Sequence, residues 1–215
     1  MPESCQCQGI AQKFDRDYVA RKLREYRRRG PATTTLQLID ALRSQGVDGM
    51  TLLDIGGGMG AIQHRLLGSG VRETVNVEAS SAYLDAARDE AERLGLTDRI
   101  VNMQGDFVDV AEQLAEADLV TLDRVICCYD DMERLVTRSV ERARRLYGVV
   151  YPRDTWWVRA GMALWYNARH RLRRNPMRNF VHRTAAVEAV IRRHGFERRF
   201  HRDMGAWQVA VFART

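Results

Sequence analysis

The sequence contains almost no lysine and no long uncharged apolar run. Lys13 and Lys22 are its only lysines, so arginine supplies nearly all of the positive charge. No run approaches the roughly 18 apolar residues that a membrane-spanning helix requires. The first twenty residues also lack the apolar stretch of a secretory signal peptide. We therefore expect a cytoplasmic protein with reduced cysteines.

Charge is unevenly distributed along the 215 residues. The net charge is +4 over residues 1–30, −8 over 31–150 and +10 over 151–215. Such basic flanks fit nucleic acid, an anionic membrane surface or an acidic small substrate, or simply arginine-rich helix faces in solvent. The basic segment 21–29 has no accompanying aromatic platform or RNA-binding motif, so we do not expect a nucleic-acid partner.

Residues 47–151 alternate between short apolar runs and segments with helical periodicity. The pattern predicts strands at 51–55, 74–78, 99–104, 118–122 and 147–151, and helices at 61–67, 80–94, 110–115 and 132–145. Two further helices are expected upstream, over 14–29 and 33–43. Strands that alternate with helices at this spacing form a mostly parallel sheet with helices on both faces.

The last third of the chain departs from this alternation. A helix is predicted over 155–173, and its apolar stripe consists of Trp157, Ala160, Gly161, Leu164, Trp165, Ala168 and Leu172. A helix over 185–194 precedes strands at 195–203 and 205–213, whose tight connection requires antiparallel pairing. We divide the chain into an N-terminal helical cap (1–46) and a main domain (47–215) with a helical lid insert at about 155–175. Peripheral contact of the insert with an anionic membrane is an alternative.

The stretch DIGGGMG (54–60) places four glycines directly after the first predicted strand. An ATP-binding P-loop is excluded because no lysine follows these glycines. The nicotinamide dinucleotide pattern G-x-G-x-x-G is nearly met by Gly56 and Gly58, with Ala61 in the third position. Glycines permit positive φ and a close approach of the backbone to a ligand. Asp54 would repel a pyrophosphate, whereas a zwitterionic sulfonium ligand tolerates it.

Two further acids and the final antiparallel hairpin add to the pattern of the glycine loop. Glu78 ends the second predicted strand, where a carboxylate can accept both ribose hydroxyls. Asp106 follows the third strand in the sequence GDF. Together with Asp54-x-Gly56-x-Gly58-x-Gly60, these features resemble the motifs of the class I S-adenosylmethionine-dependent methyltransferases.

The resemblance implies an α/β fold with a Rossmann-like seven-stranded sheet, an antiparallel last strand and helices on both faces. It implies S-adenosylmethionine as the cofactor, with Asp106 at the adenine amino group and Phe107 against the ring. The implied cofactor site consists of Asp54, Gly56, Gly57, Gly58, Gly60, Glu78, Ala79, Asp106, Phe107 and Asp123.

The stretch LDRVICCYDD (122–131) lies where class I enzymes face the transferred methyl group. It lacks the [DN]-P-P-[YF] element of DNA-type amino methyltransferases. It is more similar to small-molecule O- and C-methyltransferases, including the magnesium-protoporphyrin carboxyl methyltransferases. Cys128 stands where those enzymes often have histidine, and Asp130 replaces proline. The catalytic candidates are Cys128, Tyr129, Asp130 and His182, with His170 as a further candidate base.

The four cysteines offer a different interpretation. Cys5 and Cys7 could join Cys127 and Cys128 to bind zinc or a thiophilic substrate such as arsenic, if the N-terminal segment folds over the site. Their spacing is not that of a metal site, so we predict no metal.

The sequence as a whole favours a methyltransferase that acts on a small acidic or amphipathic acceptor, by O- or C-methylation. A nicotinamide-dependent oxidoreductase and a non-catalytic cofactor-binding protein are the alternatives. The sequence does not indicate an oligomeric state.

Overall fold

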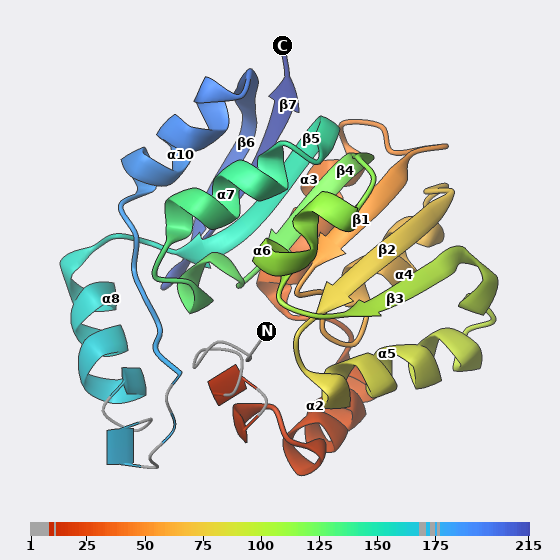
Figure 1. Cartoon of the computed structure of the whole chain (residues 1–215), viewed down its shortest axis with the longest axis horizontal. Helices are drawn as coiled ribbons and strands as arrows, with labels where there is room; N and C mark the ends of the chain where they lie inside the picture. Colours follow the sequence, from red (N-terminus) through yellow and green to blue (C-terminus); the bar gives the residue numbers. More distant parts are fainter. Residues whose placement is uncertain (1–8, 11, 168–170, 173–174, 176) are drawn as a thin grey trace.

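The computed structural model describes residues 9–10, 12–167, 171–172, 175 and 177–215. Its centre is a seven-stranded sheet (Figure 1). Its strands are β1 (Thr51–Ile55), β2 (Glu73–Glu78), β3 (Ile100–Gln104), β4 (Ala117–Asp123), β5 (Ala143–Pro152), β6 (Phe196–Met204) and β7 (Trp207–Arg214). They are arranged in the order β3-β2-β1-β4-β5-β7-β6. β7 pairs antiparallel with β5 and β6, while the pairs among β1 to β5 are parallel. The predicted Rossmann-like sheet with an antiparallel last strand is confirmed.

Helices cover both faces of the sheet. They are α2 (Arg16–Arg29), α3 (Thr33–Arg43), α4 (Ala61–Leu67), α5 (Ser81–Arg93), α6 (Phe107–Val110), α7 (Met132–Val140), α8 (Trp156–Gly161) and α10 (Thr184–Arg193). Leu135 of α7 and Val187 of α10 lie in the hydrophobic core on one face. Leu38 of α3 and Leu66 of α4 lie in the core on the other face. Among the described residues, no helix has the length and apolar character needed to cross a membrane.

The two N-terminal helices occupy different positions. α3 packs into the core of the sheet through Leu38, Ile39 and Leu42, which are fully buried. α2 packs instead against α5, beyond the carboxyl ends of the parallel strands (Figure 1). Only α2 therefore lies outside the sheet as a cap, and the domain boundary at residue 46 stays a prediction.

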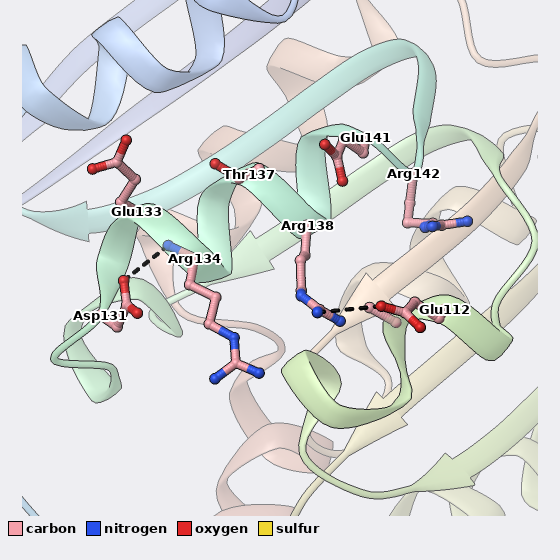
Figure 2. A pocket seen from close by; sticks show the side chains of 9 residues that line it. Glu112, Asp131, Glu133, Arg134, Thr137, Arg138, Glu141 and Arg142 are labelled. Atoms are coloured by element: carbon pink, nitrogen blue, oxygen red, sulfur yellow. Dashed lines mark hydrogen bonds and ion pairs between the residues drawn. The ribbon is translucent and has the colours of Figure 1, made fainter.

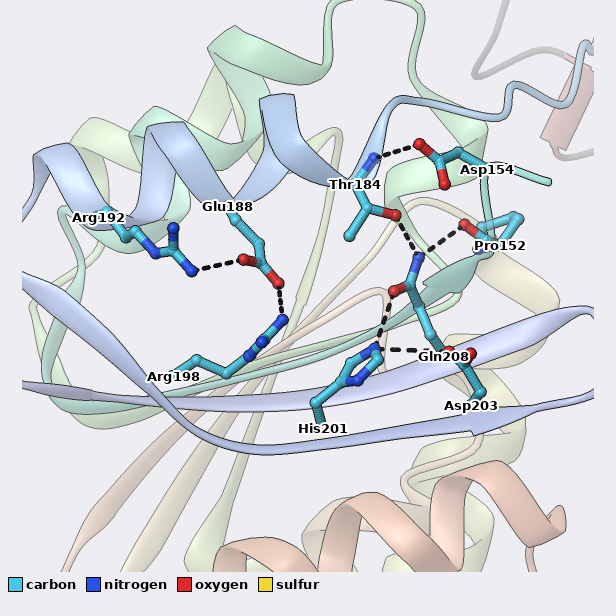
Figure 3. A network of polar contacts seen from close by, with 9 residues as sticks. All are labelled: Pro152, Asp154, Thr184, Glu188, Arg192, Arg198, His201, Asp203 and Gln208. Carbon is cyan, nitrogen blue, oxygen red and sulfur yellow. Dashed lines mark hydrogen bonds and ion pairs between the residues drawn. The ribbon is translucent and has the colours of Figure 1, made fainter.

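Polar contacts join α10 to the C-terminal hairpin (Figure 3). The buried amide of Gln208 on β7 donates to the Pro152 carbonyl at 3.2 Å and to Thr184 Oγ1 at 2.8 Å. Glu188 of α10 accepts from Arg192 at 2.8 Å and from Arg198 of β6 at 2.5 Å. Because the buried Gln208 and Glu188 side chains find their partners here, these contacts join α10 to β7 and to the edge strand β6.

Three predicted helices differ from the structure by more than two residues at one end or both. α6 begins at Phe107 rather than at 110, because the carboxylate of Asp106 caps the Val108 N–H at 3.0 Å. α7 ends at Val140, because residues from Ala143 onward pair with β4. The predicted helix over 155–173 consists of α8 and a π-helical segment, η4 (Met162–Asn167). Parts of the remainder lie outside the described residues.

Candidate functional site

The loop after β1 has a backbone that glycine alone fits well. Gly56 and Gly58 have φ angles of +63° and +56°, in the left-handed region that a side chain disfavours. A Cβ on Gly57 would lie 2.5 Å from Asp54 Oδ2 and 2.6 Å from Asn76 Oδ1. The loop is therefore packed tightly against the strands below it.

Asp54 lies beneath this loop and is fully buried. Its carboxylate accepts hydrogen bonds from Thr121 Oγ1 at 2.6 Å and from Gln63 Nε2 at 3.1 Å. Burial raises the pKa of Asp54 to about 7, although these two donors act in the opposite direction. The side chain thus connects β1, β4 and α4 under the glycines, and a direct contact with the cofactor stays a prediction.

Glu78, the last residue of β2, presents a buried carboxylate to the same region. Its Oε2 accepts from the Gly58 N–H at 3.0 Å, and its Oε1 accepts from the Ser80 N–H at 2.8 Å. Burial raises the pKa of Glu78, while these backbone donors lower it. A carboxylate has about four acceptor positions, so each oxygen can accept a further hydrogen bond from a ligand.

A cavity of about 710 Å³ lies next to these groups. It adjoins the carboxyl ends of β1, β2 and β4, the usual ligand position of open α/β sheets. Of the residues predicted to bind the cofactor, those that line it are Gly56, Gly57, Gly58, Glu78, Ala79, Phe107 and Asp123. A glycine floor, a carboxylate with free acceptor positions and the buried Phe107 ring suit an adenosine group. The residues therefore fit S-adenosylmethionine.

The other predicted cofactor residues have structural contacts in this region. Gly60 has a φ of +85° and precedes the first residue of α4. Asp106 caps α6 and also accepts a hydrogen bond from the Tyr129 hydroxyl. Their contact with a bound cofactor stays a prediction.

Described residues from two distant parts of the chain form a lid on the cavity: Ile10, Lys13 and Phe14 from the N-terminal part, and Met177 and Asn179. The Phe14 ring lies 5.3 Å from the Tyr83 ring, and the Phe14 carbonyl accepts from Ser80 Oγ at 3.1 Å. The two parts also contact each other, since Asn175 Nδ2 donates to the Gly9 carbonyl at 3.0 Å. The N-terminal part of the lid thus rests on the start of α5, two residues after Glu78.

Asp123 ends β4 and is held by two neighbours. Its carboxylate accepts from Thr35 Oγ1 at 2.5 Å and from Arg124 Nε at 2.9 Å. Arg124 has a φ of +63°, and no other non-glycine residue of the described part of the chain has a positive φ. Such strain is concentrated at functional sites, and both residues line the cavity. No sequence motif singles out Arg124.

The predicted acceptor end is only partly assembled at the cavity. Cys128 and Tyr129 line it, whereas Asp130 is exposed and is not among the lining residues. His182 Nε2 lies 2.8 Å from the Tyr129 carbonyl and its ring stacks on Phe180. Because a carbonyl oxygen only accepts, the imidazole N–H donates to it and holds the backbone at Tyr129 in place. A catalytic role for any of the four residues stays a prediction, and His170 lies outside the described residues.

Lys13 is a cavity residue that the sequence analysis did not single out. Its Nζ lies 5.1 Å from the centroid of the Phe14 ring. Within the described part of the chain, Lys13 has no ion pair with a carboxylate. Burial lowers the pKa of Lys13, and the nearby thiols of Cys128 and Cys127 raise it. The cavity therefore contains a partly buried amine whose charge no described carboxylate compensates.

The structure does not bring together a metal site from the residues it describes. In that part of the chain, no group of three or more His, Cys, Asp or Glu side chains is arranged to hold a metal ion. The Sγ atoms of Cys127 and Cys128 lie 3.3 Å and 3.7 Å from the Arg124 carbonyl oxygen. Cys5 and Cys7 lie outside the described residues, so the four-cysteine hypothesis is not tested.

A second concavity of about 560 Å³ lies against α7 and the 3-10 turn η2 (Ala111–Gln113) (Figure 2). Its lining consists largely of charged side chains that pair with their neighbours. Arg138 contacts Glu112 at 3.2 Å, and Arg193 contacts Glu133 at 2.6 Å. This concavity contains none of the glycine-loop residues and is not the candidate site.

Residues 53–149 match the protein family described as a methyltransferase domain. No curated protein matches the chain. Similar solved structures include magnesium protoporphyrin IX methyltransferase from Synechocystis with bound SAH, at a TM-score of 0.67 and 15% identity, covering 85% of this chain and 82% of that one. An O-methyltransferase family protein from Burkholderia thailandensis has a TM-score of 0.69 and 16% identity, covering 94% and 61%.

A third similar structure is an O-methyltransferase family 2 protein from Planctomyces limnophilus in complex with apigenin, at a TM-score of 0.62 and 15% identity, covering 87% of this chain and 63% of that one. At such identities the likeness shows the fold. The segment that matches the methyltransferase domain contains the glycine loop, Glu78, Asp106 and Cys128.

Proposed function

We propose that this chain, an S-adenosylmethionine-dependent methyltransferase with the class I fold, transfers its methyl group to a small-molecule acceptor with an anionic oxygen or carbon nucleophile. The observation that carries the proposal is that one cavity combines predicted cofactor residues with part of the acceptor end. The cavity of about 710 Å³ is lined by seven of the ten predicted cofactor residues and by Cys128 and Tyr129, and the lid residues line it as well. A volume of this size suits small ligands rather than a macromolecular surface.

The chain's own residues would hold the cofactor from three sides. Glu78 would accept the ribose hydroxyls, and Phe107 and Ala79 would pack against the adenine. Asp123 would face the amino group of the methionine moiety. When bound, S-adenosylmethionine supplies an electrophilic methyl group on a positively charged sulfur. The protein's part is to align an acceptor with that methyl group and to exclude water, which together provide much of the rate of a displacement.

Lys13 indicates the charge of the acceptor. A partly buried ammonium group with no described carboxylate partner is stabilised by an anionic ligand group. Met162 and Met177 line the same cavity and are buried, so the body of the acceptor meets flexible apolar side chains. We therefore infer an acidic or amphipathic acceptor.

An acceptor that arrives as an anion does not need to lose a proton before it attacks. Methyl transfer to a carboxylate or phenolate oxygen requires no general base. This agrees with the contacts at the acceptor end, where the Tyr129 hydroxyl donates to Asp106 and the His182 ring donates to a carbonyl. A catalytic base among Cys128, Tyr129, Asp130 and His182 is not necessary for this chemistry.

The proposal is tested by transfer of labelled methyl from S-adenosylmethionine to acceptors that share an aromatic body. A carboxylic acid, a phenol, an amine and a neutral alcohol should differ in rate. The carboxylic acid, which is ionised at neutral pH, should be methylated fastest, followed by the phenol, which must first lose its proton. Lys13→Met should raise KM for the acids by about tenfold or more, because one charge-assisted hydrogen bond is lost. Lys13→Arg should restore much of the binding.

The other lysine provides the matched control. Lys22 also lines the cavity but is half-exposed and paired with Glu25 at 2.8 Å. Lys22→Met should leave the KM for acids close to that of the wild type. Preferred methylation of the amine, with Lys13→Met unchanged, would contradict the proposed acceptor class.

A further inference from the structure

The segment around α8 exposes large apolar side chains to solvent. Trp156 is 80% exposed, Leu164 is 75% exposed and Leu172 is 86% exposed, and Trp157 is 44% exposed. Among the described residues, only Leu94 and Val101 are other large hydrophobic side chains with comparable exposure. Clustered exposure of this kind marks an interaction surface, whereas single exposed residues are ordinary.

The helix cannot bury these side chains by rolling, because its opposite face is already packed. Val158 and Met162, one turn apart, are buried at 3% and 7% exposure. Met162 also lines the cavity. Turning Trp156 and Leu164 inward would expose Val158 and Met162 and open the cavity wall. The apolar face is therefore a stable outer surface of the folded chain.

The charged side chains of the segment that carries this face are basic. Between Asp154 and Glu188 the sequence has no acidic residue, but it contains seven arginines and three of the four tryptophans of the chain. Arg159 and Arg171 are exposed in the same segment. Arginine next to exposed tryptophan and leucine is typical of helices that lie in a membrane interface, where apolar groups enter the acyl boundary and guanidinium groups meet anionic headgroups.

We propose that this face, consisting of Trp156, Trp157, Arg159 and Leu164 and named here the α8 face, docks on an anionic lipid bilayer. The docked helix lies flat on the surface with Met162 pointing away from the lipid. Figure 1 shows α8 at the periphery of the molecule, beyond the carboxyl ends of the parallel strands. The bilayer would thus lie beside the acceptor end of the cavity. That an amphipathic acceptor enters from the bilayer rests on the proposed function, whereas the docking does not.

Co-sedimentation of the full chain with vesicles tests the docking. Vesicles of phosphatidylcholine with phosphatidylserine should bind the protein, and added salt should weaken the binding because it screens the arginines. Vesicles of phosphatidylcholine alone should bind at least about tenfold less, since anionic lipid attracts each nearby arginine. Tryptophan fluorescence should shift to the blue on binding.

Variants on the exposed face separate docking from folding. The double change Trp156→Gln and Leu164→Gln should weaken binding to the anionic vesicles by about 100-fold, since two large apolar side chains no longer enter the lipid. Leu94→Gln, an exposed leucine that follows α5, should bind as the wild type does. The urea midpoint of the double variant should be unchanged, because both side chains are exposed in the folded chain.

Several outcomes would overturn the proposal. The proposal is wrong if the protein binds neutral and anionic vesicles equally or binds neither. It is also wrong if the double variant binds anionic vesicles as well as the wild type does. A dimer in solution that the double variant converts to a monomer would assign the α8 face to a second copy of the chain instead. Since none of these measurements requires methyl transfer, failure of the docking is distinguishable from failure of the proposed function.

Discussion

Replacing Asp54 with asparagine should remove a strong pH dependence from the stability of this protein. Burial raises the pKa of Asp54 from 3.8 to about 7 in the folded state. Because the folded state binds this proton more tightly than the unfolded state, the stabilising contribution is complete below about pH 4 and is lost as the pH rises to about 7. The difference of roughly 3 pH units corresponds to about 4 kcal/mol.

The asparagine variant keeps the shape and most of the hydrogen bonds of this site. Its amide oxygen can still accept from Thr121, and its amide nitrogen can donate to Gln63 Oε1 after the Gln63 amide turns over. That oxygen is buried and has no partner among the described residues. The variant should therefore avoid the cost of the ionised carboxylate at a small loss in hydrogen bonding.

Urea unfolding of both proteins at several values between about pH 5 and about pH 8 tests this reasoning. The free energy of unfolding of Asp54→Asn minus that of the wild type should increase with pH, by a few kcal/mol over the range. Subtracting the two free energies of unfolding at each pH cancels the contribution of the titratable groups that both proteins share. Asp118→Asn, in the neighbouring strand, reports the effect of removing a partly exposed carboxylate. A difference between Asp54→Asn and wild type that stays constant with pH would refute the argument.

Two further changes test the cofactor site. Gly57→Ala places a methyl group 2.5 Å from Asp54 Oδ2 and should lower the free energy of unfolding, measured in urea, by about 1–3 kcal/mol. Gly161→Ala is the control and should not destabilise the protein, because nothing lies within 4 Å of its new Cβ. Glu78→Gln replaces one acceptor oxygen by a donor that faces a backbone N–H, and should weaken S-adenosylhomocysteine binding by about 1–3 kcal/mol in calorimetry. Glu73→Gln, at the exposed start of the same strand, is the control, and equal affinities of the two variants would rule out the role of Glu78.

The sheet and the cofactor loop were predictable because their signals are local. The apolar run at 51–55 is β1 to the residue, and helix 61–67 has the predicted bounds. Ser80 caps α5 by accepting from the Tyr83 N–H at 3.3 Å, as its hydroxyl and position indicated. Glu78 reaches the cavity because a residue at a parallel strand's carboxyl end must lie at that edge.

The features that the sequence analysis missed depend on contacts between distant segments. The arginine-rich residues after Val140 look helical locally, but Ala143 pairs with Ala117 of β4. The 155–173 helix showed an apolar stripe, yet its buried face is that of Val158 and Met162. Periodicity identifies an apolar face and does not tell which face meets the core. Lys13 is likewise unremarkable in sequence, because its role depends on where the N-terminal segment folds.

The most direct test of the account is calorimetric titration of the full chain with S-adenosylhomocysteine, and with NADH and ATP in parallel. The glycine loop, Glu78 and Phe107 line one cavity, and a nucleotide pyrophosphate would meet the carboxylate of Asp123 there. We therefore expect saturable binding of S-adenosylhomocysteine, with no binding of NADH or ATP at the same concentrations. Saturable binding of NADH without binding of S-adenosylhomocysteine would contradict it.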